Sequence, residues 1–83
     1  MYCTAFVIEV TGVHIPGGTQ IGSGVTLTKC KNICENMPTC LALDFHEGNC
    51  WAHDYDTYCG SFRRKDGVIH AKKLPCGISN DSQ

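Results

Sequence analysis

The chain has 83 residues, seven cysteines and a formal net charge of −1. A domain this small buries only about 60% of its unfolded surface, so its core needs support from disulfides, a metal or a partner chain. So many cysteines favour a disulfide scaffold made in an oxidising compartment, and we expect a secreted, extracellular protein. The charge argues against non-specific nucleic-acid binding. The sequence has no run of about 18 apolar residues, so we expect no membrane insertion.

The N-terminal part predicts a strand and a loop. Residues 2–10 are rich in β-branched and aromatic side chains and precede turn-forming residues, which is typical of a strand. Residues 16–24 hold four glycines and predict a loop that contains at most a short strand. Neither half of the chain could bury a core alone, so residues 1–83 are expected to form a single domain.

Residues 27–36 predict one helix. Thr26 is placed to cap its first turn, and Pro38 is placed to end it. Apolar side chains recur at helical spacing and draw one stripe along the predicted helix. Cys30 and Cys34 lie on that stripe, so their side chains face the same way.

The C-terminal part predicts short strands. Residues 39–45 and 49–53 form a predicted hairpin with Gly48 at its turn, and residues 67–72 form a last strand. Residues 77–83 are polar, and we expect a flexible tail there. One helix among four or five strands, without βαβ alternation, predicts an α+β fold in which a single helix packs on a small antiparallel β-sheet.

The cysteine spacing restricts the disulfides without fixing them. Counting alone leaves roughly a hundred ways to pair seven cysteines. Two cysteines on one helical face have parallel side chains, so Cys30 and Cys34 should each pair with a cysteine beneath the helix rather than with each other.

These motifs resemble the PAN/apple domain family. That family has a helix with Cys-x3-Cys, then a cysteine that opens a strand of the type Cys-x-Ala/Gly-Leu/Phe-x-Phe/Tyr, then a cysteine in the next strand. This chain has Cys30-x3-Cys34, the segment Cys-Leu-Ala-Leu-Asp-Phe at 40–45, and Gly-Asn-Cys-Trp at 48–51. The close match covers about residues 26–53.

The resemblance extends to the apple subtype, in which the first and last cysteines join the two ends of the domain. It implies the disulfides Cys30–Cys50, Cys34–Cys40 and Cys3–Cys76. Cys59 departs from the apple pattern. We therefore expect Cys59 to be a buried free thiol, to form an interchain bridge in a homodimer, or to displace a terminal cysteine from its partner.

Candidate ligand-binding residues are basic and aromatic. Residues 63–73 carry five basic side chains and one acidic one, which could bind an anionic glycan or an acidic protein surface. Trp51 could join an aromatic patch with Tyr55 and Tyr58, although a tryptophan directly after a bridged cysteine is more often part of the core. The predicted ligand-binding residues are Arg63, Arg64, Lys65, Tyr55, Tyr58, Lys72 and Lys73.

Catalytic, metal and cofactor sites are not expected. The four histidines and seven cysteines include no close Cys-x2-Cys ligand pair of the kind that structural zinc sites use. Asp54 and Asp56 lie outside any twelve-residue calcium loop. Cys59 with His53 or His70 could be drawn as a catalytic dyad, but a domain this small offers little rigid concave volume. We therefore do not expect this chain to be an enzyme.

The expected function is recognition of a protein or a carbohydrate outside the cell. A rigid disulfide scaffold lowers the entropic cost of ordering its binding loops. Two alternatives remain open at this point: a self-associating structural or matrix protein, and a secreted defence protein or inhibitor.

Overall fold

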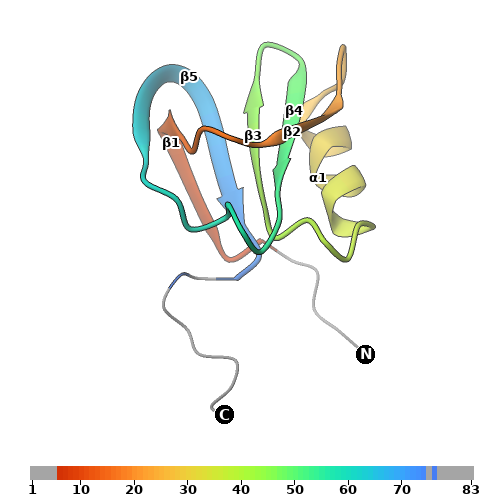
Figure 1. The fold of residues 1–83 in the computed structure, drawn as a ribbon. Helices are drawn as coiled ribbons and strands as arrows, with labels where there is room; N and C mark the ends of the chain where they lie inside the picture. Colours follow the sequence, from red (N-terminus) through yellow and green to blue (C-terminus); the bar gives the residue numbers. More distant parts are fainter. Residues whose placement is uncertain (1–5, 75, 77–83) are drawn as a thin grey trace.

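The computed structural model describes residues 6–74 and 76, which form one α-helix and a five-stranded antiparallel sheet. The strand order is β1-β5-β3-β4-β2, and α1 lies against one face of the sheet (Figure 1). The predicted α+β class is therefore confirmed. The elements are β1 (Ile8–His14), β2 (Thr19–Gly22), α1 (Leu27–Glu35), β3 (Ala42–His46), β4 (Asn49–His53) and β5 (Arg63–Lys72).

The helix forms where the sequence predicts it. The Thr26 side chain accepts a hydrogen bond of 3.1 Å from the backbone N–H of Lys29, which satisfies one of the free donors of the first turn. Cys30 and Cys34 form the buried face of α1. The disulfides Cys30–Cys50 and Cys34–Cys40 tie this face to β4 and to the residues before β3.

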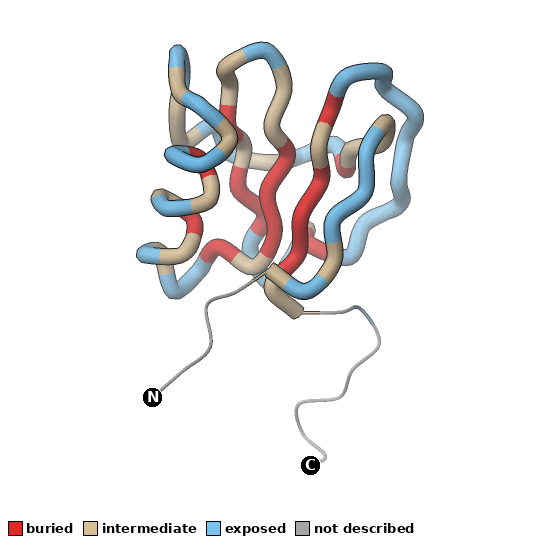
Figure 2. The backbone as a smooth tube through the Cα atoms, turned by 180° about the vertical axis from the view of Figure 1, so that it is seen from behind, coloured by how far each residue is buried: buried red, intermediate tan, exposed pale blue. Residues whose placement is uncertain are grey.

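Strand alternation gives the sheet two different faces. Leu43 and the cysteines of α1 belong to one apolar cluster, which also includes Ala52 and Ala71 of the neighbouring strands. The other face carries Asp44, and it is crossed by the segment that joins β1 to β2 (Figure 1). Buried residues lie mainly along the central strands (Figure 2). The core therefore lies on both sides of β3, apolar toward α1 and partly polar on the opposite side.

Two strands differ from the prediction. β1 begins at Ile8 and runs to His14, whereas residues 2–10 were expected; residues 1–5 lie outside the described residues. β5 begins at Arg63, four residues before the predicted last strand. Pairing with β1 extends it, since His14 lies opposite Arg63. The basic segment 63–65 therefore belongs to β5. The register of the pair is irregular at Gly12, whose φ of 91° favours glycine.

The third disulfide corrects the sequence-based pairing. Cys76 is bonded to Cys59, with 5.6 Å between the Cα atoms, so the predicted Cys3–Cys76 bridge is wrong. Cys59 is accordingly neither a free thiol nor an interchain cysteine here; the alternative in which it displaces a terminal cysteine is the one observed. The loop after β4 lies beside the chain that leaves β5, and this proximity decides the pairing. Cys3 and the predicted tail 77–83 lie outside the described residues.

Candidate functional site

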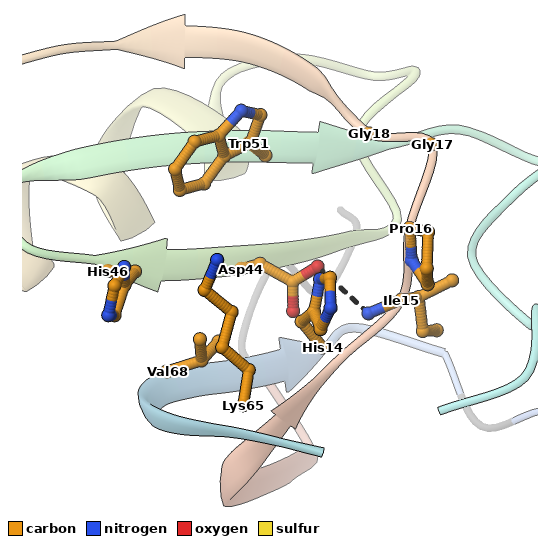
Figure 3. Close-up of a pocket in the computed structure, with 10 residues that line it drawn as sticks. All are labelled: His14, Ile15, Pro16, Gly17, Gly18, Asp44, His46, Trp51, Lys65 and Val68. Carbon is orange, nitrogen blue, oxygen red and sulfur yellow. Dashed lines mark hydrogen bonds between the residues drawn. The ribbon is translucent and has the colours of Figure 1, made fainter. Parts of the chain in front are cut away.

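A pocket of about 310 Å³ opens on the sheet face opposite to α1. It lies between the segment that joins β1 to β2 and the strands β3, β4 and β5 (Figure 3). The volume is at the lower end of the range for pockets that hold small ligands. Its lining residues are His14, Ile15, Pro16, Gly17, Gly18, Asp44, His46, Trp51, Lys65 and Val68.

The strand register explains why these residues meet. Asp44 of β3 lies opposite Trp51 of β4, and directly paired residues share one face of a sheet. His46 follows two residues after Asp44, so it lies on the same face. The alternation that turns Leu43 toward α1 thus turns Asp44 and His46 toward the pocket.

A close approach of the chain builds the wall near Trp51. A Cβ atom at Gly18 would lie 3.0 Å from His53 Cε1, 3.1 Å from Trp51 Cβ and 3.2 Å from the Ala52 carbonyl oxygen. Any residue other than glycine would have to push these neighbours back by a few tenths of an ångström. The crossing segment and β4 therefore enclose Trp51, which is half-buried.

Lys65 is the exposed cation of the pocket. Arg63 lies opposite His14 across the β1–β5 pair, which places its side chain on the same face as that imidazole. His46 has an acidic neighbour, since its Nε2 atom lies 3.9 Å from Glu47 Oε2. Lys65 therefore makes the rim near β5 basic, and Arg63 adds a second exposed basic side chain on the same strand.

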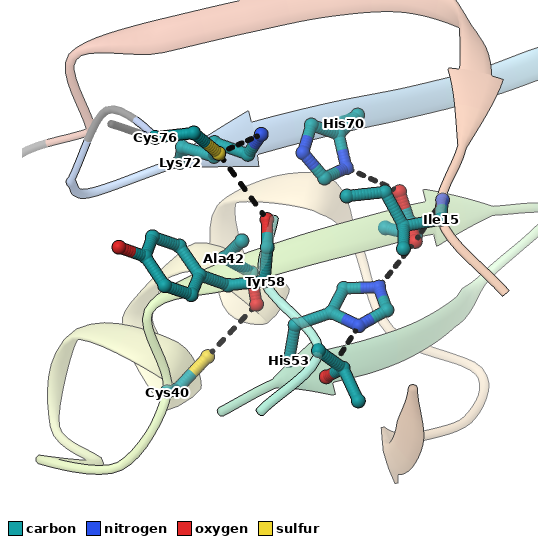
Figure 4. Close-up of polar contacts among 10 residues, drawn as sticks. Ile15, Cys40, Ala42, His53, Tyr58, His70, Lys72 and Cys76 are labelled. Carbon is teal, nitrogen blue, oxygen red and sulfur yellow. Dashed lines mark hydrogen bonds and ion pairs between the residues drawn. The ribbon is translucent and has the colours of Figure 1, made fainter. Parts of the chain in front are cut away.

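Asp44, which lines the pocket, is the centre of a buried hydrogen-bond network. Asp44 is 3% exposed, and its Oδ1 accepts a hydrogen bond of 2.6 Å from His70 Nδ1. Its Oδ2 accepts bonds of 2.8 Å from His53 Nε2 and 3.2 Å from the Ile15 backbone N–H (Figure 4). His53 Nδ1 in turn lies 3.0 Å from the Thr57 hydroxyl. This network joins three strands to the crossing segment and to the loop after β4.

Opposing effects set the protonation of Asp44. Burial alone would raise its pKa, because a charge loses solvation inside a protein. The hydrogen bonds from His53 and His70, the electrostatic attraction of His70 and the Ile15 N–H together outweigh burial, so the pKa of Asp44 lies below its ordinary value. Asp44 is therefore an anion at neutral pH whose bonding capacity is largely used inside the fold. Contacts to a ligand fall to the other residues of the pocket.

The structure places one residue of the predicted basic segment at the pocket. Arg63, Arg64 and Lys65 are all exposed on β5, and Lys65 lines the cavity. The two tyrosines predicted to bind a ligand differ in their exposure to solvent. Tyr55 is 69% exposed, whereas Tyr58 is 7% exposed, with 5.9 Å between the two ring centroids. Tyr58 therefore acts as a support for Tyr55 rather than as a contact surface.

Contrary to the prediction, Lys72 and Lys73 do not contribute to an exposed basic patch, because both side chains are engaged inside the fold. Lys72 is 5% exposed, and its Nζ lies 3.1 Å from Cys76 Sγ and 4.8 Å from the centroid of the Phe62 ring. Lys73 Nζ donates to the Cys34 carbonyl oxygen at 2.7 Å. Burial lowers the pKa of both lysines, against a smaller opposing attraction from carboxylates. Lys72 ends β5 and Lys73 follows it, whereas Arg63 begins the strand, so the five basic residues do not form one patch.

Sequence reasoning missed part of the site. It considered the histidines as zinc ligands or as partners of Cys59 in a catalytic dyad, and it favoured Trp51 as a core residue. The signal was the alternation across the predicted hairpin, which places Asp44, His46 and Trp51 on one face once the register is known.

The part of the chain that the structure describes contains no group of three or more His, Cys, Asp or Glu side chains arranged to hold a metal ion. In the same residues, no helix is long and apolar enough to cross a membrane. No protein-family model matches the chain, and neither curated proteins nor solved structures give a significant match.

Proposed function

We propose that this chain is a PAN/apple-like extracellular recognition module that binds an acidic saccharide in the pocket around Trp51 and Lys65. The observation that carries the proposal is the placement of a half-buried indole and an exposed ammonium in the same pocket. An aromatic face offers an apolar platform for the C–H groups of a sugar ring. A cation beside it favours a sugar that bears a carboxylate or sulfate group.

The scaffold supports this function. Three disulfides hold the described part of the chain, and two of them tie α1 to the sheet on the side away from the pocket. A cavity built on tied strands loses little conformational freedom when a ligand binds, so more of the contact energy appears as affinity. Disulfides of this density also favour an oxidising, extracellular location.

Trp51 supplies the test, because it is the only tryptophan in the chain. Its fluorescence should change when an acidic oligosaccharide, such as a heparin fragment, is titrated into the protein, and a neutral oligosaccharide of equal length should have a weaker effect. Trp51→Phe keeps an aromatic face and serves as a conservative variant, whereas Trp51→Ala should lose at least about tenfold in affinity by calorimetry, the scale of one well-packed aromatic contact.

Lysine variants test the charge. Lys65→Ala should weaken binding about threefold to tenfold and reduce its dependence on salt, since one exposed charge contributes modestly and is screened. Lys29→Ala is the matched control, because Lys29 is exposed on α1, on the other side of the sheet. Equal affinity for acidic and neutral oligosaccharides, or an unchanged Trp51 signal at saturation, would overturn the proposal.

A further inference from the structure

The three disulfides lie in different environments. The sulfur-bearing side chains of Cys30, Cys34, Cys40 and Cys50 belong to residues that are at most 1% exposed. Cys59 and Cys76 are both exposed. Thiol–disulfide exchange requires a thiolate to reach a sulfur atom, so a thiol in solution reaches the third bridge much more readily than the other two.

Lys72 distinguishes the two sulfur atoms of the exposed bridge. Its Nζ lies 3.1 Å from Cys76 Sγ, and Cys76 Sγ also lies 3.9 Å from the Tyr58 carbonyl oxygen (Figure 4). The ammonium is attracted by Asp44, but within the described residues no carboxylate lies at ion-pair distance from it. A disulfide sulfur is a weak acceptor, whereas a thiolate is an anion. The contact therefore becomes strong only when the bridge opens with the charge on Cys76.

We propose that Cys59–Cys76 is a thiol-exchange site, at which an external thiolate attacks Cys59 Sγ and Lys72 stabilises Cys76 as the leaving thiolate. The bond formed joins the incoming sulfur to Cys59 Sγ. The bond broken is Cys59 Sγ–Cys76 Sγ, and its electron pair passes to Cys76 Sγ. The products are a mixed disulfide on Cys59 and a thiolate at Cys76, which is paired with the Lys72 ammonium and needs no proton.

The physical basis is the leaving-group effect. A thiol of lower pKa leaves faster in exchange, and a neighbouring lysine lowers the pKa of a cysteine thiol. The burial of Lys72 strengthens the effect, because a charge pair is screened less away from water. Removal of this bridge leaves the two bridges of α1 in place, so exchange changes the loop between β4 and β5 rather than the whole domain.

The experiment measures where and how fast a small thiol reacts. The full chain carries Cys3→Ser, so that the cysteine outside the described residues supplies no thiol, and it is incubated oxidised with excess reduced glutathione. Acid quenching and peptide mapping by mass spectrometry then locate the adduct. We expect glutathione on Cys59 before any adduct forms on Cys30, Cys34, Cys40 or Cys50.

Variants test the role of Lys72. Lys72→Met should slow adduct formation at Cys59 by at least about threefold, because the leaving thiol then has a higher pKa. Lys72→Arg should retain most of the rate, since it keeps the charge. Lys29→Met controls for the removal of an exposed positive charge, and it should leave the rate unchanged. Near-UV circular dichroism of each oxidised variant checks that it is folded.

A second measurement does not depend on a variant. After glutathione has reacted with Cys59, the freed Cys76 should alkylate with a pH midpoint below the value of about 8.5 that an ordinary thiol has. An ordinary midpoint, equal adducts on Cys59 and Cys76, equal opening of the buried bridges, or an unchanged rate in folded Lys72→Met would each overturn the proposal.

Discussion

Replacing Asp44 by alanine should destabilise the domain more than any other single change of a carboxylate in its described part. The substitution removes the acceptor of three hydrogen bonds, from His53 Nε2 at 2.8 Å, from His70 Nδ1 at 2.6 Å and from the Ile15 N–H at 3.2 Å. Both imidazoles are 0% exposed, so neither ring contacts bulk water while Asp44 is in place.

The magnitude follows from these donors. A buried polar group that loses its partner costs about 1–3 kcal/mol, and breaking a buried charged network typically costs about 3–5 kcal/mol. We expect a loss of about 3–5 kcal/mol in the free energy of unfolding. The loss should not exceed this range, because the pocket beside Asp44 gives water partial access to the Ile15 N–H. For a domain of this size, 1 kcal/mol corresponds to about 4–8 °C in Tm, so Tm should fall by at least roughly 12 °C.

Urea unfolding of the oxidised protein, followed by Trp51 fluorescence, measures the change. Asp66→Ala is the matched control, because Asp66 is exposed on β5, and it should shift stability by less than about 0.5 kcal/mol. Asp44→Asn should lie between the wild type and Asp44→Ala, since one amide oxygen still accepts. A loss below about 1 kcal/mol in Asp44→Ala would refute the reasoning, because it would mean that the imidazoles find other partners at little cost.

Three further predictions concern acid, disulfides and the crossing segment. Burial opposes the charge of Asp44, but its hydrogen bonds hold its folded pKa below the ordinary value of 3.8, so its stabilising contribution is complete above pH 3.8 and is lost as the pH falls through the folded pKa. The stability difference between wild type and Asp44→Asn, measured in urea from pH 2 to 7, should therefore be constant in the upper part of this range; a difference that grows toward pH 2 would contradict the sign. Removing Cys30–Cys50 as paired alanines should cost about 3 kcal/mol and removing Cys34–Cys40 about 2 kcal/mol, since the bridges span sequence separations of 20 and 6; thermal unfolding checks the order, and the reverse order would show that loop closure does not decide it. Gly18→Ala should lower Tm and weaken saccharide binding together, because its Cβ would contact β4, whereas the exposed neighbour Thr19→Ala should change neither.

The sequence alone predicted the helix α1 and the hairpin of β3 and β4, because each depends on residues close together in the chain. Thr26 and Pro38 bound the helix because a cap and a breaker act within a turn of the chain. Gly48, with a φ of 82°, makes the hairpin turn between β3 and β4. The two bridges of α1 agree with the pairing that the PAN/apple resemblance implied, and the helical stripe already required cysteines beneath the helix.

Tertiary structure decided the features that join distant residues. Asp44 and His70 are 26 positions apart and meet because β3 pairs with β5 in one register; a shift of one residue would turn Asp44 toward α1. Cys76 pairs with Cys59 because the loop after β4 lies beside it, which no spacing rule gives. The sequence by itself determined the helix, its apolar stripe and the β3–β4 hairpin, because those depend on short-range effects. The pocket, the buried lysine and the third bridge required the sheet register, because they depend on which strands lie side by side.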